Sequence, residues 1–370
     1  MSEAAFDSLY LVVAVAAACA VPGVFLVLRR LALIGDAISH VLLFGIVVAY
    51  FVVRDLESPW LTVGAALSGV LTVALVELLQ RSKLVQEDAA IGLVFPALFA
   101  AGTLLASMHL RGTHLDVDAV LLGHAELASW TDRVFLVGYY LGRLPTVTMS
   151  VLFAVNVLLV LAFYKELKLG TFDPALAATF GFLPGLLHYG LMTVVSVTSV
   201  AAFDAVGPIL VVAFLIVPAA TAILLVDRLH WVLLVAVLVA VVAATMGVVV
   251  AFQFKTNTAG TVATVLGAIF GLTFLVAPGR GLIARIVRRF RQRRAFNVTM
   301  LTIHLLQHEG TPAEPDEARE DGLHRHLQWA PAEVAAVIRR AFGEELIERS
   351  GPLLTLTEAG RTRARSVLNL

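Results

Sequence analysis

Up to about residue 279 the chain alternates long apolar runs with short polar links. A helix needs about 20 apolar residues to cross the core of a bilayer. Nine runs come close to that length and predict nine transmembrane helices, give or take one: 8–28, 33–53, 60–79, 89–108, 146–164, 184–203, 206–226, 229–252 and 260–277.

Two parts of this pattern are ambiguous. The runs 184–203 and 206–226 are separated only near Asp204 and Pro208, which predicts either a tight hairpin or a broken helix. Residues 119–145 are moderately apolar and could hold a short re-entrant or interfacial helix.

The pattern changes after residue 279. Residues 280–294 contain seven arginines, and residues 295–370 carry 8 Lys+Arg and 11 Asp+Glu, a net charge of −3. We therefore predict a transmembrane domain (1–279), a basic junction (280–294) and a small polar domain (295–370).

The polar domain has the element order of a winged helix, which is an α+β fold. Pro331 is suited to the first position of a helix, and a Ser-Gly-Pro turn separates two short strand-like stretches. The expected elements are helices at 296–308, 321–327 and 332–343, and strand–wing–strand with the start of a further helix at 346–360.

Composition supports a membrane class. Hydrophobic residues are 59% of the 370, and charged residues only 15%, whereas soluble domains carry about 25% charged residues. The fold class is therefore an all-α polytopic membrane protein with about nine transmembrane helices, plus the small α+β cytoplasmic domain. The single cysteine, Cys19, excludes a disulfide within the chain.

The distribution of Lys and Arg predicts the orientation, because cytoplasmic links carry the excess of positive charge. With the N-terminus outside, seven such residues fall in inner links and five in outer links, and the seven arginines of 280–294 also fall inside. Glu3 and Asp7 replace the basic start of a signal peptide, so the first run is expected to be retained.

The most informative polar group is residues 35–40, GDAISH, at the start of the second run. An ionisable side chain within a span is costly and is a functional hypothesis by default. Asp36 and His40 are four residues apart, so a helix places them on one face about 6 Å apart. Oxygen and nitrogen donors without thiolate suit Mn²⁺, Zn²⁺ or Fe²⁺. The alternative is a helix-capping Asp36 with a buried, hydrogen-bonded His40.

Two other groups of polar residues are weaker candidates for metal binding. His114, Asp116 and Asp118 lie with His109 in an outer link, where an incoming ion could pause, although an ordinary solvated loop is the simpler interpretation. Asp204 could line a path or merely cap a hairpin.

Several stretches resemble, in the same order, the permeases of the manganese/zinc/iron class of ABC metal importers. They are GDAISH followed by Gly45, LVQEDAAIGL (84–93), GTHLDVD (112–118) with Leu122-Gly123, FYKEL to TFDP (163–174), and AVG to PAATA (205–222). The match covers residues 8–278. It departs from the family at 129–145, where this chain carries extra residues.

The resemblance implies that Asp36 and His40 bind the metal on its path through a bacterial inner membrane. Such permeases work in pairs, so two copies, or a sister permease, would together offer four ligands. It also implies an extracytoplasmic metal-binding protein as a partner. No permanently bound cofactor is expected, because the divalent ion is cargo.

The resemblance further implies that residues 165–180 dock on a cytoplasmic ABC ATPase dimer. The coupling residues in this stretch are Glu166, Phe172, Asp173 and Pro174. The chain has no G-x-x-x-x-G-K phosphate loop and no Gly-Lys dipeptide. We therefore expect a transport subunit rather than an enzyme, with ATP hydrolysed by a partner chain.

The ending L-x-L-T-x-x-G of the polar domain resembles the iron- and manganese-responsive repressors. Reading DNA normally needs a basic face, but this domain has a net charge of −3 and only Arg339 and Arg340 on its would-be recognition helix. We expect a regulatory or docking module rather than a DNA-binding one. His304 and His308, four residues apart, could sense metal or have no role.

Two rival functions remain. One is a permease for metal chelates such as siderophores or cobalamin, which would not need an Asp/His pair within the membrane. The other is a membrane-anchored transcription regulator, which would not need nine spans. The sequence does not rank Mn²⁺, Zn²⁺ and Fe²⁺, and it does not say whether the partner permease is identical.

Overall fold

The computed structural model describes residues 3–55, 58–109, 131–136 and 139–368. Contacts between residues divide the chain into two compact units, Met1–Pro278 and Gly279–Leu370. Within the described residues nine helices are long and apolar enough to span a membrane. The predicted fold class, an all-helical polytopic membrane protein, is confirmed.

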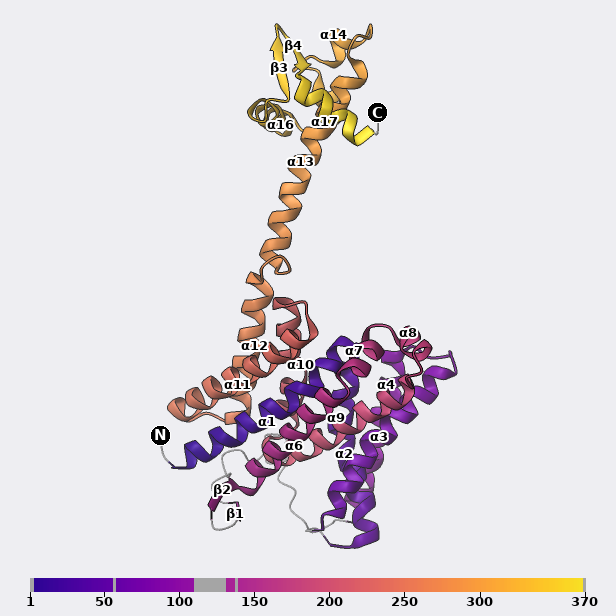
Figure 1. Cartoon of the computed structure of the whole chain (residues 1–370), viewed down its shortest axis with the longest axis vertical. Coiled ribbons are helices and arrows are strands. Elements are labelled where there is room, and N and C mark those ends of the chain that lie inside the picture. The colour runs from indigo at the N-terminus through magenta and orange to yellow at the C-terminus, as the bar shows by residue number, and fades with distance from the viewer. Residues whose placement is uncertain (1–2, 56–57, 110–130, 137–138, 369–370) are drawn as a thin grey trace. The chain divides into compact units, whose positions relative to one another are not determined.

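The described residues of the first unit form helices and one pair of strands (Figure 1). Its elements are α1 (Glu3–Leu28), α2 (Ala32–Val53), α3 (Trp60–Arg81), α4 (Glu87–His109), β1 (Arg133–Leu136), β2 (Tyr139–Arg143), α6 (Leu144–Ala162), α7 (Tyr164–Phe172), α8 (Pro174–Thr179), α9 (Pro184–Val206), α10 (Pro208–Leu225), α11 (Leu229–Phe254) and α12 (Thr258–Val276).

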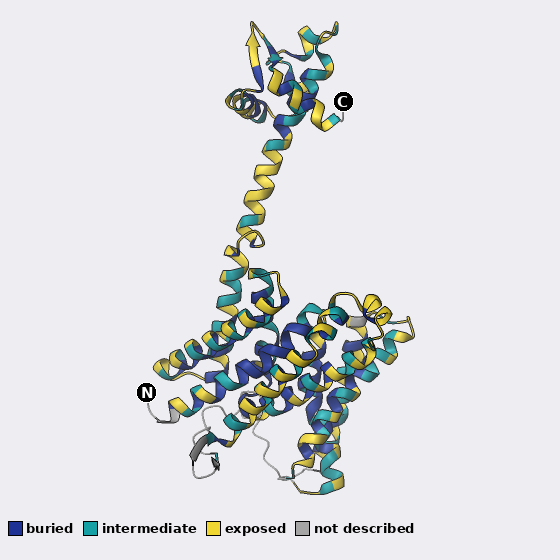
Figure 2. Cartoon of the chain, viewed as in Figure 1, coloured by how far each residue is buried: buried dark blue, intermediate teal, exposed yellow. Residues whose placement is uncertain are grey.

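Helix α1 lies at the centre of this unit and contacts α6, α9, α10 and α11. It is the most buried of the nine membrane-length helices, as its dark blue ribbon shows in Figure 2. Small residues allow this close packing where the hydrophobic effect is absent. At Gly23 a Cβ would lie 2.1 Å from the carbonyl oxygen of Leu215 in α10, so only glycine fits.

Buried polar side chains also join the helices. Asn156 of α6 donates hydrogen bonds of 3.0 Å to the carbonyl oxygen of Ala18 in α1 and to Thr198 Oγ1 in α9. Hydrogen bonds of this kind hold membrane helices together because hydrocarbon offers the amide no other partner.

The boundary between α9 and α10 falls at a single residue. Gly207 has φ 81°, a conformation that glycine adopts without strain, and Pro208 begins α10 at the first helical position. The run 184–226 is therefore two helices interrupted at Gly207.

Residues 133–136 and 139–143 pair as the antiparallel strands β1 and β2, with an irregularity between Val134 and Phe135. The helix considered for 119–145 is therefore wrong over this stretch, where aromatic and β-branched residues favour strands; residues 119–130 lie outside the described residues. The buried Arg143 donates from Nε to Asp7 Oδ2 at 3.0 Å and from Nη1 to the carbonyl oxygen of Thr131 at 2.8 Å, which ties the hairpin to α1.

The second unit has its own core. Its elements are α13 (Leu282–His308), α14 (Glu314–Glu317), α15 (Leu323–His326), α16 (Pro331–Gly343), the antiparallel pair β3 (Ile347–Ser350) and β4 (Leu353–Leu356), and α17 (Glu358–Leu368). Leu301, Leu323, Ile338 and Leu354 are among its fully buried residues.

Helix α13 starts earlier than the predicted residue 296, because the arginine-rich stretch 280–294 contains good helix formers and no glycine or proline after Gly281. Residues 285–294 are exposed along this part of the helix (Figure 2). The order of helices and hairpin is the one expected, but the strands have only four residues each, and the winged-helix assignment stays a prediction.

Candidate metal site and coupling segment

Asp36 and His40 lie in the first turns of α2, with His40 Nε2 3.5 Å from Asp36 Oδ1. Their side chains are 43% and 36% exposed, respectively. The residues between them, from Ala37 to Ser39, are buried. The pair therefore shares one face of α2 that the rest of the chain leaves half open.

One wall of this site is aromatic. The ring of His40 lies 5.4 Å from the ring of Phe95 and 6.3 Å from that of Phe99, both on α4. These rings restrict the imidazole on one side without offering a ligand atom. One chain thus contributes one carboxylate and one imidazole, fewer than the four to six ligands that divalent metals prefer.

Glycines fix the position of α2 against its neighbours. A Cβ at Gly45 would lie 2.3 Å from the carbonyl oxygen of Gly64 in α3. A Cβ at Gly102 of α4 would lie 2.9 Å from the backbone of Phe44. Because no side chain fits at either contact, the backbones approach closely and set where Asp36 and His40 point.

The other metal candidates are not brought to this pair. Asp204 is exposed in the last turn of α9, and within the described part of the chain no contact joins it to Asp36 or His40. His114, Asp116 and Asp118 lie outside the described residues.

The coupling candidates form a short helical segment, α7 and α8. Asp173 caps α8 by accepting a 2.9 Å hydrogen bond from the backbone N–H of Leu176, and Pro174 opens the helix. The side chain of Phe172 is 60% exposed. Exposed large apolar residues continue along this segment: Leu176, Phe180 and Leu183.

Beneath this segment lie charged residues to which sequence reasoning gave no role in coupling. Arg29, at the end of α1, donates from Nε to Thr171 Oγ1 of α7 at 3.1 Å. Glu77 of α3 accepts hydrogen bonds from Tyr189 of α9 and, at 2.7 Å, from Arg81. From the sequence, Arg29 was assigned only to an inner link between two spans. Nothing in the sequence connects Glu77 with Tyr189, which is 112 residues away.

Two buried atoms near the segment are unpaired within the chain. Glu166 Oε2 and Arg29 Nη2 have no hydrogen-bond partner among the residues that the structure describes. Buried charged groups without partners are costly.

Among the described residues, nine helices long and apolar enough to span a membrane indicate a multi-pass membrane protein. The chain belongs to the ABC 3 transport family, because the sequence pattern of that family matches residues 1–277. The resemblance inferred from the motifs is therefore confirmed at the level of the family.

Individual relatives extend this result. The chain is 43% identical over 358 residues to the "Zinc transport system membrane protein TroD" of Treponema pallidum (strain Nichols), covering 97% of each chain. It is 40% identical over 282 residues to the "Manganese transport system membrane protein MntD" of Bacillus subtilis (strain 168), covering 76% of this chain and 95% of that one.

A solved structure has the same fold over the first unit. It is "PsaBC from Streptococcus pneumoniae in complex with Fab", with a TM-score of 0.63 and 25% identity, covering 76% of this chain and 94% of that chain. About three quarters of this chain thus cover nearly all of MntD and of the solved structure. The match with TroD is longer and extends into the second unit.

Proposed function

We propose that this chain is the membrane-spanning permease of an importer for a divalent transition metal, Mn²⁺, Zn²⁺ or Fe²⁺, driven by ATP hydrolysis on a separate chain. The observation that carries the proposal is the Asp36/His40 pair, 3.5 Å apart within a span, in a chain whose relatives are named for zinc and manganese transport.

The half-open face of the pair supports a site shared between two permeases. A carboxylate and an imidazole from each of two facing copies, or from a sister subunit, would give four oxygen and nitrogen ligands. Such a set accepts manganese, zinc and iron(II), so the ligands alone do not select one metal. The 43% exposure of Asp36 is consistent with a covering partner, because an uncovered carboxylate facing lipid would be costly.

The exposed apolar segment of α7 and α8 supports docking on a cytoplasmic ABC ATPase. Phe172 would insert into the ATPase, and Asp173 and Pro174 would hold α8 in the docking shape. Glu166, on α7 of the same segment, is the remaining coupling candidate.

The remaining partners follow from the orientation. With the N-terminus outside and the second unit in the cytoplasm, an extracytoplasmic binding protein would deliver metal to the outer links. His114, Asp116, Asp118 and Asp204 are candidates for transient contacts there. The second unit would act as a regulatory or docking module, with DNA binding not expected from its net charge of −3.

Metal uptake by cells that lack their own importers tests the proposal. Asp36→Ala and His40→Ala should each reduce uptake of radioactive Mn²⁺ or Zn²⁺ to background, because each removes a ligand from the path. His230→Ala and Asp132→Ala change exposed residues of the same types elsewhere and should transport normally. Normal uptake by both site variants at wild-type membrane levels would contradict the ligand assignment.

A further inference from the structure

A second group of metal-ligating side chains lies in the second unit, far along the sequence from Asp36 and His40. His304 and His308 lie on α13, and Glu317 lies on α14. One ligand atom from each of the three comes within 4.8 Å of the other two. Across the described residues this is the one group of three or more His, Cys, Asp or Glu side chains at such distances.

The two histidines are four residues apart on one helix, and their ring centroids lie 4.9 Å apart. This i, i+4 pair on a helical face is the arrangement that zinc-binding helices use. Glu317 adds a carboxylate, with Oε2 3.4 Å from His304 Nε2. Two imidazoles and one carboxylate form a familiar zinc set that leaves a fourth position for water.

The distances suit a site that closes around an ion. Tetrahedral ligands at about 2.0–2.1 Å from Zn²⁺ lie about 3.4 Å from one another, so the separation of up to 4.8 Å needs a small contraction. A small rotation of the half-buried side chains would supply it.

A fourth residue orients the carboxylate. Nδ1 of His326, on α15, lies 2.9 Å from Oε2 of Glu317, and its ring lies 6.3 Å from that of His304. A partner of this kind holds a ligand in position, and losing it typically weakens metal binding about 10–100-fold. His326 is therefore a positioning residue for Glu317.

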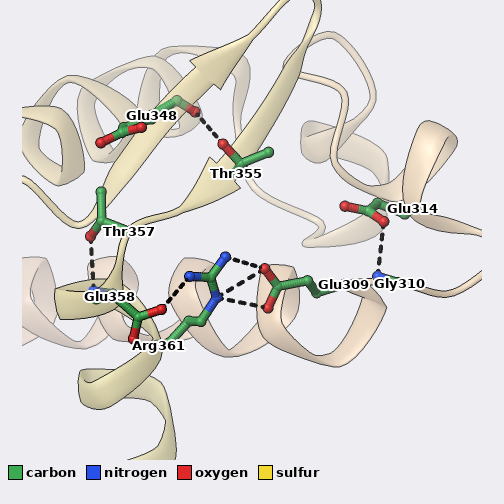
Figure 3. Close-up of polar contacts among 9 residues, drawn as sticks. Glu309, Gly310, Glu314, Glu348, Thr355, Thr357, Glu358 and Arg361 are labelled. Carbon is green, nitrogen blue, oxygen red and sulfur yellow. Dashed lines mark hydrogen bonds and ion pairs between the residues drawn. The ribbon is translucent and has the colours of Figure 1, made fainter.

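The backbone around the cluster is held by other contacts. After α13 ends, the N–H of Gly310 donates to Glu314 Oε2 at 2.8 Å, which fixes the turn into α14. Arg361 of α17 holds Glu309 with its shortest contact at 2.7 Å (Figure 3). These contacts hold the backbone beside His308, and His304 Nε2 lies 3.1 Å from the carbonyl oxygen of Glu317, which keeps α14 beside α13.

We propose that His304, His308 and Glu317 bind a divalent transition metal, with Zn²⁺ preferred over Mn²⁺ because two of the three ligands are imidazoles. A bound ion would join α13 to α14 and, through His326, to α15. If the proposed function holds, this unit faces the compartment that receives the ion, and occupancy would report how much has been imported.

Metal binding by the purified full-length chain tests the site. The measurement uses an Asp36→Ala/His40→Ala background, which removes the permease pair, and titrates Zn²⁺ against a chromophoric chelator. About one Zn²⁺ per chain should remain bound. Co²⁺ in its place should give the visible absorption of low-coordinate nitrogen and oxygen ligation.

In that background His308→Ala and Glu317→Gln should each weaken this binding at least 100-fold, and His326→Ala about 10–100-fold. His324→Ala is the matched control, since His324 lies on the same short helix as His326 but outside the cluster, and it should bind normally. Circular dichroism checks that each variant is folded. If a histidine variant does not fold, Glu317→Gln still tests the site, because glutamine keeps the shape of the glutamate side chain.

Two results would overturn the proposal: no Zn²⁺ retained in the Asp36→Ala/His40→Ala background, or equal affinity in His308→Ala, Glu317→Gln and the His324→Ala control. Retention of Mn²⁺ in preference to Zn²⁺ would contradict the imidazole-based selectivity. These outcomes are separate from the uptake test, which can fail while the second unit still binds metal.

Discussion

The ion pair between Asp7 and Arg143 gives the most quantitative prediction about the membrane unit. The two side chains are 15% and 9% exposed and lie 3.0 Å apart, and they join α1 to the β1–β2 hairpin. Asp7→Ala leaves the guanidinium buried with only the carbonyl oxygen of Thr131 as its described partner. Removing one member of a buried pair costs about 3–5 kcal/mol.

A double-mutant cycle measures this interaction. Asp7→Ala and Arg143→Ala should each destabilise the unit by about 3 kcal/mol, the lower end of that range, because the site lies near an end of α1. The double variant should lose clearly less than the sum, with a coupling energy of about 0.5–3 kcal/mol. Denaturant unfolding in detergent, followed by circular dichroism, gives the global values, and hydrogen exchange shows whether the hairpin alone is released.

Asp132→Ala is the control, because Asp132 is exposed beside the same hairpin; its effect should stay within about 0.5 kcal/mol. Single variants as stable as this control, with unchanged hydrogen exchange in residues 131–143, would show that the ion pair contributes nothing and that our reasoning is wrong.

Three further predictions concern other parts of the chain. Gly45→Ala should destabilise the α2–α3 contact by about 1–3 kcal/mol, since its Cβ would meet a carbonyl oxygen at 2.3 Å. Gly92→Ala is the control: its Cβ would meet no neighbouring element within 4 Å, so it should not lower stability in thermal unfolding. Phe172→Asp should abolish metal-stimulated ATP hydrolysis in a reconstituted complex, and Phe172→Leu should preserve it; equal activities would argue against docking there. Arg340 and, next, Arg363 lower the pKa of Glu344 below 4.5. The two ion pairs therefore stabilise the second unit above about pH 4.5, and this stabilisation is lost as the pH falls through the lowered pKa. Glu344→Gln should reduce stability at pH 7 but not at pH 2, measured by the fluorescence of Trp329 in a chain that keeps it as the sole tryptophan.

Much of the membrane fold was predictable, because hydropathy reports directly which segments prefer hydrocarbon. Each of the nine apolar runs became one helix, with ends shifted by a few residues. An interruption near Asp204 and Pro208 was also visible from the sequence, and the structure places it at Gly207. The hairpin at 133–143 was not, since its moderate apolarity fits a strand as well as an interfacial helix, and its anchor on Asp7 is a contact across 136 residues.

The candidate site divides in the same way. The spacing of Asp36 and His40 predicted that they would share a helix face, and the structure places His40 Nε2 3.5 Å from Asp36 Oδ1. The rings of Phe95 and Phe99 beside His40 depend on tertiary packing that no local pattern encodes. In the second unit the pair His304 and His308 was visible from the sequence. Glu317 joins the pair only because the turn after α13 brings α14 back beside α13.

ATP-driven uptake into proteoliposomes tests the central claim most directly. The chain would be reconstituted with its ATPase, and ATP would be supplied on the side of the ATPase while free ⁵⁴Mn²⁺ or ⁶⁵Zn²⁺ is supplied with the binding protein on the other. We expect the free ion to accumulate only with ATP, and not in the Asp36→Ala/His40→Ala chain. Accumulation of a metal chelate instead, or equal accumulation by the double variant, would contradict it.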